Sequence, residues 1–183
     1  MHRSCFRRSQ SAPLLFSLKP LNPAADAVVN DPDNASLLSK LQDGRRVLGI
    51  RVNMRSKCPY VLVTIGSGDA DILVKRPNIA PIQCSFSANW DTGVTMLRDT
   101  SIDSSTETFG ACYAVWRWSS PPTCGCIMGS RRRGAVEFEI VWHDYAEEAM
   151  ARVIANKPKE RIKEQRWRPQ VTLARPERAS ASY

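Results

Sequence analysis

The sequence has few of the residues and patterns that catalysis or membrane insertion requires. Only two of its 183 residues are histidines, His2 and His143, and no nucleophile elbow or set of three metal ligands accompanies them. No apolar run approaches the roughly 20 residues that a membrane-spanning helix needs. The glycine-rich loop and strand lysine of protein kinases are also missing. These absences favour a soluble, non-enzymatic protein with no catalytic residues, metal or cofactor.

The six cysteines are scattered, and no secretory signal precedes them. Cys124-Gly125-Cys126 is a closely spaced pair, but no second pair or nearby histidine completes a set of four metal ligands. We therefore predict free thiols, with this pair in an irregular loop over residues 119–133. Free thiols are typical of a reducing compartment, so we expect an intracellular protein of the cytoplasm or nucleus.

Acidic residues are missing from the first twenty positions, which carry four basic side chains. Residues 151–183 carry nine basic and three acidic groups, whereas residues 21–150 have thirteen basic and fifteen acidic ones. The formal net charge of +8 therefore belongs to the two ends of the chain. Because the central region is close to neutral, the overall basicity does not indicate that it binds nucleic acid.

These composition shifts divide the chain into four parts. Residues 1–44 form an Arg-, Ser- and Pro-rich segment, partly disordered, with short helices predicted over 24–29 and, capped by Asn34, over 35–41. Residues 45–143 hold short strand-like runs separated by turns, the pattern of a β-sandwich. Residues 144–157 predict a helix. Residues 158–183 are a basic tail that we expect to be disordered.

The sandwich prediction depends on alternating apolar and polar residues. Over 135–142, Val136, Phe138, Ile140 and Trp142 fall on one face and glutamates on the other, which predicts a half-buried strand. Further strands are predicted near 46–53, 60–65, 70–75, 82–88, 93–98 and 113–118. The predicted core contains Ile65, Ile72, Phe86, Leu97, Phe138 and Trp142.

A series of motifs adds a family resemblance. Residues 63–74 read as a strand, a glycine turn with the two acids Asp69 and Asp71, and a second strand. Residues 79–86 (Ile-Ala-Pro-Ile-Gln-Cys-Ser-Phe) and 104–110 (Ser-Ser-Thr-Glu-Thr-Phe-Gly) follow in that order. This order resembles the forkhead-associated (FHA) domain, in particular the divergent FHA-like regions that precede protein kinases in filamentous fungi. The resemblance implies a mainly β fold, a sandwich of the SMAD/FHA type with short flanking helices, whose loops capture phosphothreonine peptides.

A phosphothreonine pocket needs a fixed guanidinium together with hydroxyl and backbone donors. The loop candidates that the resemblance implies in this chain are Gly66, Ser67, Gly68, Ala80, Gln83, Ser105, Thr106 and Glu107. Several of them depart from the family pattern. Ser67 stands at the position of the family's Arg, Ala80 at that of its Ser, and Thr106 at that of its Asn. Gln83 replaces a structural His, where an amide could still join loops by hydrogen bonds.

These replacements predict a degenerate phosphate pocket. We expect an adaptor that binds a protein partner in signalling or as a scaffold, with negligible dependence on phosphothreonine. The alternative is a rebuilt phosphopeptide-binding domain of a kinase-associated protein, in which Lys75, Arg76 or Arg98 replaces the missing guanidinium.

The residues raise two further candidate partners, nucleic acid and a 14-3-3 protein. Nucleic acid is disfavoured, although residues 131–133 are three arginines and Trp116, Trp118 and Trp167 could stack on bases, because alternate aromatic residues in a strand usually pack in a core. Residues 8–13 (Arg-Ser-Gln-Ser-Ala-Pro) fit the pattern that 14-3-3 proteins recognise when Ser11 is phosphorylated. The acid-free N-terminus also has the composition of a mitochondrial transit peptide, a reading that Pro13 weakens.

Overall fold

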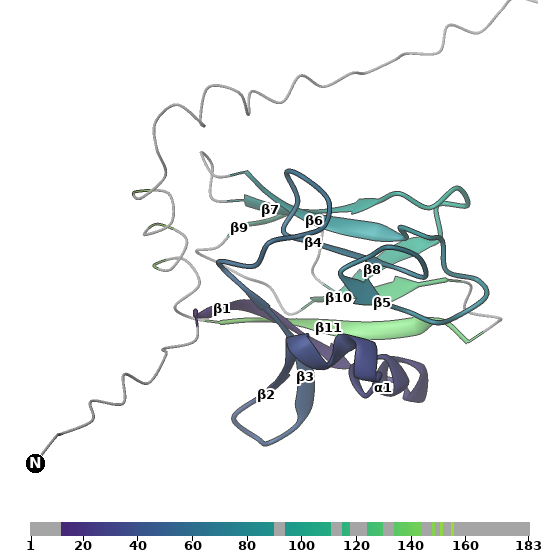
Figure 1. Cartoon of the computed structure of the whole chain (residues 1–183), viewed down its shortest axis with the longest axis horizontal. Coiled ribbons are helices and arrows are strands. Elements are labelled where there is room, and N and C mark those ends of the chain that lie inside the picture. Colours follow the sequence, from purple (N-terminus) through teal and green to yellow (C-terminus); the bar gives the residue numbers. More distant parts are fainter. Residues whose placement is uncertain are drawn as a thin grey trace, which may run out of the picture.

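Two β-sheets stacked in layers make up most of the part of the chain that the structure describes. The structure is a computed structural model and describes residues 12–89, 94–110, 115–117 (backbone), 124–129 and 134–143, together with the helical positions Glu148, Ala151 and Ala155. Figure 1 shows the two layers edge on, with a helix beneath the lower one. The predicted mainly β, sandwich-like class is therefore confirmed at this coarse level.

The first layer is a six-stranded sheet in the order β2-β3-β1-β11-β10-β8. Its strands pair antiparallel throughout. They are β1 (Leu14–Pro20), β2 (Leu38–Lys40), β3 (Arg46–Arg51), β8 (Thr106–Gly110), β10 (Cys124–Met128) and β11 (Val136–Trp142).

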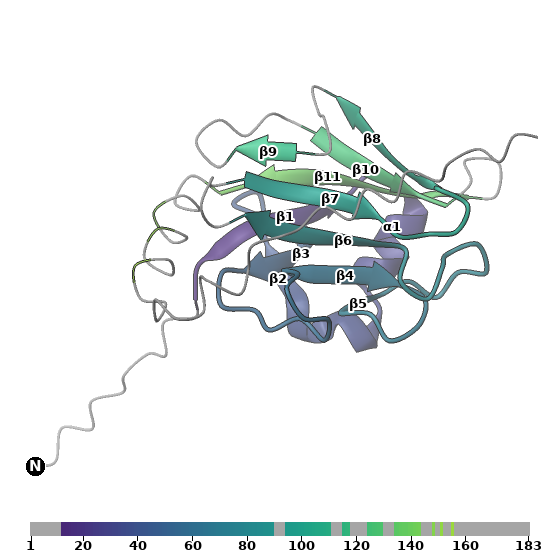
Figure 2. The same cartoon turned by 90° about the horizontal axis from the view of Figure 1, so that it is seen from above.

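The second layer is a five-stranded sheet in the order β5-β4-β6-β7-β9, which Figure 2 shows from above. The β4–β5 pair is parallel and the other pairs are antiparallel. The strands are β4 (Val63–Gly66), β5 (Ile72–Leu73), β6 (Cys84–Asn89), β7 (Val94–Asp99) and β9 (Val115–Arg117).

Aromatic side chains from both sheets meet in the core between them. Phe16 on β1 and Phe86 on β6 are fully buried, and their ring centroids lie 4.9 Å apart across the sandwich. Phe138 is also fully buried, and Trp142 is half-buried with its ring centroid 5.1 Å from that of Phe16. Each such ring removes enough apolar surface from water to stabilise the fold by about 1.5–3 kcal/mol. The alternation predicted over 135–142 is confirmed as β11.

The predicted domain boundary at residue 44 is corrected, because part of the N-terminal segment belongs to the sandwich. β1 lies between β3 and β11 in the six-stranded sheet, and Leu15, Phe16 and Leu18 are fully buried. Within the predicted N-terminal segment of residues 1–44, the chain is part of the sheet from Leu14 onward. Apolar residues 14–16 and 18 supply one of the most buried strands, so the sandwich begins before residue 45.

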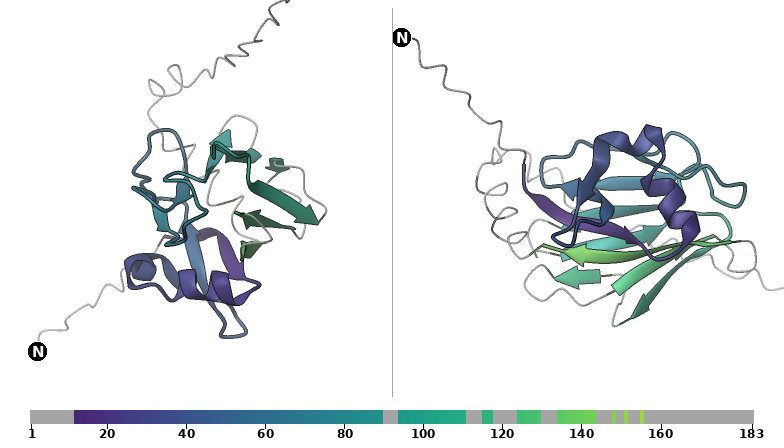
Figure 3. Two further views of the ribbon diagram at one scale, coloured as in Figure 1. Left: turned by 90° about the vertical axis from the view of Figure 1, so that its right-hand side faces the viewer. Right: turned by 90° about the horizontal axis from the view of Figure 1, so that it is seen from below.

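A short helix then covers the outer face of the six-stranded sheet (Figure 3, right). α1 (Pro23–Val29) starts at Asn22, whose side chain accepts a hydrogen bond from the Ala25 amide and donates one to the Ala135 carbonyl. The buried residues of α1 are alanines and valines, which allow a close approach to the strands. The predicted helix over 24–29 is confirmed.

The prediction of a second N-terminal helix, over residues 35–41, is wrong. Residues 35–41 divide between a 3-10 helix, η1 (Pro32–Leu37), and strand β2. Asn34 is no helix cap but is fully buried, and its amide pairs with both backbone groups of Leu73 on β5, at 2.8 Å and 2.9 Å. It also donates to the Val28 carbonyl. Asn34 thus bonds along the open edge of the five-stranded sheet as a neighbouring strand would.

The predicted irregular loop over residues 119–133 is also corrected, because residues 124–128 form β10. All five residues of β10 are buried, so the strand has no polar face and no alternation to reveal it. Gly125 is required here, since a Cβ at this position would lie 2.3 Å from the backbone carbonyl oxygen of Phe138 on the neighbouring strand. Cys124 and Cys126 are free thiols buried in this strand rather than exposed in a loop.

Candidate functional site

Two loops at one end of the five-stranded sheet are joined by backbone hydrogen bonds. The Ser67 amide donates to the Ala80 carbonyl at 2.9 Å, and the Gly68 amide donates to the Pro81 carbonyl at 3.1 Å. The Ser67 hydroxyl donates to the Ile79 carbonyl at 2.7 Å. A Cβ on Gly66 would lie 2.1 Å from the Pro81 carbonyl oxygen, so only glycine permits this approach.

Gln83 connects this pair of loops to a third one. Its side chain is fully buried, and its carbonyl oxygen accepts a hydrogen bond from the Ala80 amide at 3.0 Å. Its nitrogen donates to the hydroxyls of Ser105 (3.1 Å) and Thr106 (2.9 Å). The structure therefore brings the three predicted loops together, and one amide side chain does so.

The third loop, residues 100–105 between β7 and β8, is fixed at its base by Asp99. The Asp99 carboxylate accepts hydrogen bonds from the amide and hydroxyl of Ser101, at 2.9 Å and 2.7 Å, and from those of Thr106, at 3.0 Å and 3.2 Å. Burial of this carboxylate raises its pKa, but the hydrogen bonds lower it more, so that the pKa of Asp99 lies below its ordinary value. Asp99 thus remains an anion at neutral pH.

Further contacts hold the same loop from both sides. The Ser101 hydroxyl accepts a hydrogen bond from the Ser105 amide at 2.9 Å, and the Ser105 carbonyl accepts one from Gly129 at 3.0 Å. Ser104 adopts a left-handed backbone conformation with φ of 49°, which a residue with a side chain adopts only at some cost. We name residues 66–68, 79–83 and 99–107 the loop cluster.

Many of the polar groups of the loop cluster hold its loops together. In the loops that the structure describes, the hydrogen-bond donors of Ser67, Gly68 (amide), Ala80, Gln83 (side chain) and Thr106 are all directed at other loop atoms. A phosphate needs such donors to point outward. Glu107 is exposed beside them at the start of β8 and adds negative charge.

The three candidate replacement cations differ in their surroundings. The Lys75 ammonium lies between Asp31 (3.0 Å) and Asp33 (2.7 Å), beside η1. Hydrogen bonds to Asp33 and Asp31 raise the pKa of Lys75. Arg98 is exposed on β7, directly opposite Ser85 of β6. Arg76 is half-buried near Gly134, where an added Cβ would lie 3.6 Å from its guanidinium.

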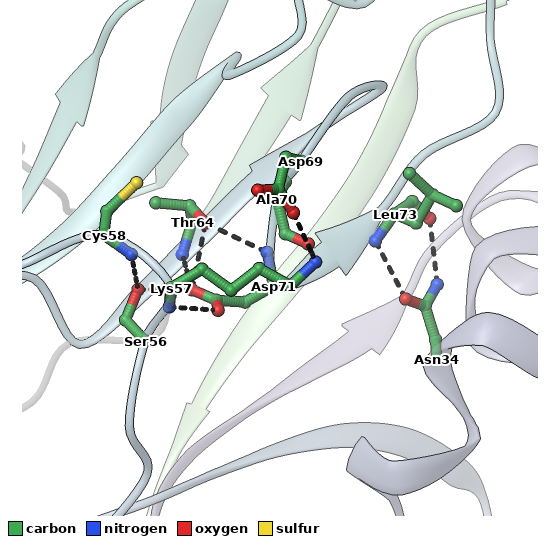
Figure 4. A network of polar contacts seen from close by, with 9 residues as sticks. All are labelled: Asn34, Ser56, Lys57, Cys58, Thr64, Asp69, Ala70, Asp71 and Leu73. Carbon is green, nitrogen blue, oxygen red and sulfur yellow. Dashed lines mark hydrogen bonds and ion pairs between the residues drawn. The ribbon is translucent and has the colours of Figure 1, made fainter.

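A second polar network lies at the β4–β5 edge, and the sequence interpretation, which assigned Asp69 and Asp71 to a turn, missed it (Figure 4). The Asp71 carboxylate accepts hydrogen bonds from the Ser56 hydroxyl, the Lys57 amide (2.8 Å), and the amide and hydroxyl of Thr64 (2.8 Å and 2.9 Å). Lys57 also forms an ion pair with Asp69 at 2.8 Å. This network fixes the chain before β4 onto the sheet edge.

Ser17 and His143 form a hydrogen bond of 2.9 Å between β1 and the end of β11. Because Ser17 is fully buried, its hydroxyl has no access to a substrate, and the pair holds two strands together. Among the described residues, no group of three or more His, Cys, Asp or Glu side chains is placed to hold a metal ion. None of the helices within the described part has the length and apolar character needed to cross a bilayer.

Several sequence predictions fall outside the described residues. They are the predicted phosphosite Ser11, most of the 144–157 helix and the basic tail. The side chains considered for nucleic-acid binding also fall outside, namely Trp116, Trp118, Trp167 and the arginines at 131–133. Three positions of that predicted helix, Glu148, Ala151 and Ala155, are helical and exposed. Comparison of the chain with known proteins gave no match to a family model, to a curated protein or to a solved structure.

Proposed function

We propose that this protein is an FHA-type interaction module that acts as a signalling or scaffolding adaptor and binds its protein partner without requiring phosphothreonine. The observation that carries the proposal is the direction of the donors in the loop cluster. The Ser67 amide and hydroxyl and the Gly68 amide donate to the neighbouring loop at residues 79–81, so a phosphate would have to break those bonds to enter. A binding role in place of a catalytic one fits a loop cluster that contains no histidine or cysteine.

The missing side chains make the same argument quantitatively. A hydrogen bond to a charged group contributes about 1.5–3 kcal/mol. Lacking the guanidinium at Ser67 and the hydroxyl at Ala80 should therefore lower phosphate affinity by about two to four orders of magnitude. The carboxylates of Asp99 and Glu107 oppose the approach of a second anion, which makes the loss larger.

The experiment is a paired screen of the full chain against libraries of phosphothreonine peptides and the same peptides with unmodified threonine, near physiological salt. We expect no peptide that binds only in its phosphorylated form. Selective capture of phosphopeptides with micromolar Kd would contradict the proposal and support the rebuilt pocket.

One structural observation favours the alternative function, a phosphopeptide pocket in which another cation replaces the missing guanidinium. Arg98 is exposed and directly precedes Asp99 of the loop cluster. The variant Arg98→Gln separates the two readings. If phosphopeptides are captured and this variant loses them, the alternative function holds; Lys75→Gln is the matched control, since Lys75 already pairs with two carboxylates.

A further inference from the structure

The loop between β7 and β8 has an isoleucine at its tip. Ile102 is 99% exposed, more than the other exposed large hydrophobic residues among those described, Tyr60 at 76% and Leu21 at 44%. Its side chain gives the isolated fold no packing energy, since it contacts almost only water. A single exposed apolar side chain is ordinary by itself, so a binding role for Ile102 depends on how its loop is held.

The backbone that carries Ile102 is held in one conformation. Ser101, directly before it, is fixed by two hydrogen bonds to Asp99, and its hydroxyl accepts one from the Ser105 amide. Thr106 and Ser105 are bonded to the buried Gln83. A preorganised tip loses little conformational entropy when it binds, so the burial of Ile102 would contribute to affinity nearly in full.

The charge around the tip specifies the partner. Within residues 99–107 the exposed charged side chains are Asp103, next to Ile102, and Glu107, whereas the exposed Arg98 lies at the base of the loop. A surface that binds this tip should be apolar at its centre and basic at its border. A phosphorylated surface would be repelled by the same charges.

We propose that Ile102 is the anchor of a docking surface that inserts into an apolar pocket, bordered by lysine or arginine side chains, on a protein partner. The inference rests on the proposed interaction function and assigns that function to one side chain. Binding buries the Ile102 side chain while Asp103 and Glu107 face the basic border. The contact requires no change in the loop cluster.

The probe for this inference is a random peptide library displayed on phage and panned against the full chain. We expect selected peptides to combine a bulky apolar residue with nearby lysines or arginines. In binding measurements with the synthetic peptides, Ile102→Ala should weaken the affinity by about ten- to hundredfold. Asp103→Asn should weaken it less and reduce its salt dependence. Tyr60→Ala, which removes another exposed hydrophobic residue, is the matched control and should leave affinity within about twofold.

Both Ile102→Ala and Ile102→Asp should fold as the parent does, which thermal unfolding verifies. No enrichment, enrichment of acidic peptides, or equal binding by the parent and Ile102→Ala would overturn the inference. If the parent and Ile102→Ala bound unphosphorylated peptides equally, the phosphate-independent function would still stand. If only phosphopeptides bound in the paired screen of the proposed function, both proposals would fail. Binding to phosphatidylcholine vesicles that is lost in Ile102→Asp would overturn the assignment of a protein partner.

Discussion

Two polar networks of this molecule use similar chemistry but support different structures. One is the loop cluster, and the other is the edge network, which consists of Asn34, Ser56, Lys57, Thr64, Asp69 and Asp71 at the β4–β5 edge. At the β4–β5 edge, Asn34 and Asp71 satisfy strand groups and bring the chain back onto the sheet (Figure 4). In the loop cluster, Gln83 and Asp99 hold three loops that end in an exposed tip. The comparison teaches that a polar network alone does not identify a binding site. The difference lies in what the network supports: a covered sheet edge in one region, an exposed isoleucine in the other.

The largest effect should come from Asn34 in the edge network. Asn34→Ala removes the side-chain bonds to the Leu73 amide and carbonyl and one of the bonds to the Val28 carbonyl, which should lower the free energy of unfolding by about 2–4 kcal/mol. Urea denaturation measures the change, with Asn53→Ala at an exposed position as the control. A loss below about 1 kcal/mol would mean that the edge does not depend on Asn34.

Gln83 should have a smaller effect on stability but a larger one on the loop cluster. Gln83→Ala removes three side-chain hydrogen bonds and should lower the free energy of unfolding by about 1–3 kcal/mol. Hydrogen exchange of the amides in residues 101–106 should accelerate at the same time. Gln42→Ala, at an exposed glutamine, is the control and should change neither measurement. Unchanged exchange in Gln83→Ala would show that Asp99 alone fixes the third loop.

Asp99 should make stability depend on pH in the acidic range. Its pKa is lowered in the folded state, so its contribution is fully present above the unfolded pKa near 3.8 and is lost as the pH falls through the folded value. Asp99→Asn should therefore be less stable than the parent by about 1 kcal/mol at pH 7, and the gap should shrink below about pH 4. Urea denaturation from pH 7 to pH 3 measures this; a gap that is constant over the whole range would contradict it.

The smallest effect is expected at the surface ion pair of the edge network. Lys57 and Asp69 are 2.8 Å apart, but the side chain of Asp69 is 89% exposed. Exposed pairs of this kind contribute little, so Lys57→Met should change the free energy of unfolding by less than about 0.5 kcal/mol. A loss above about 1.5 kcal/mol would show that Lys57 helps to hold the edge through its contact with the Ala70 carbonyl.

Two kinds of strand could be predicted from the sequence. β11 has one buried and one exposed face, and its alternation is plain over residues 136–142. β4 is buried throughout but is an apolar run that ends in a glycine turn. β10 has no alternation because both of its faces are buried, and β1 stands behind an Arg- and Ser-rich stretch that resembles a tail. Neither strand has a local signal, because their burial comes from partners distant in the chain.

In the candidate site, too, features that depend on partners distant in the chain could not be predicted from the sequence. The family resemblance predicted which loops belong together, and Gln83 lies among them in the structure. The role of Asn34 could not be predicted, because a buried asparagine and a helix-capping asparagine look alike in the sequence and its partner Leu73 lies 39 residues away. The exposure of Ile102 likewise depends on how the loop is held, and an isolated isoleucine between polar residues carries no such information.

The central claim is that the loop-cluster donors of Ser67, Gly68, Ala80, Gln83 and Thr106 are occupied and unavailable to phosphate. A two-dimensional NMR titration of the full chain with a phosphothreonine peptide tests it most directly, with the unmodified peptide as the control. The account predicts that the amide signals of Ser67, Gly68 and Thr106 respond to the phosphorylated peptide no more than to the control, up to millimolar concentration. Saturable shifts of these signals with the phosphopeptide alone, at a micromolar Kd, would contradict the claim.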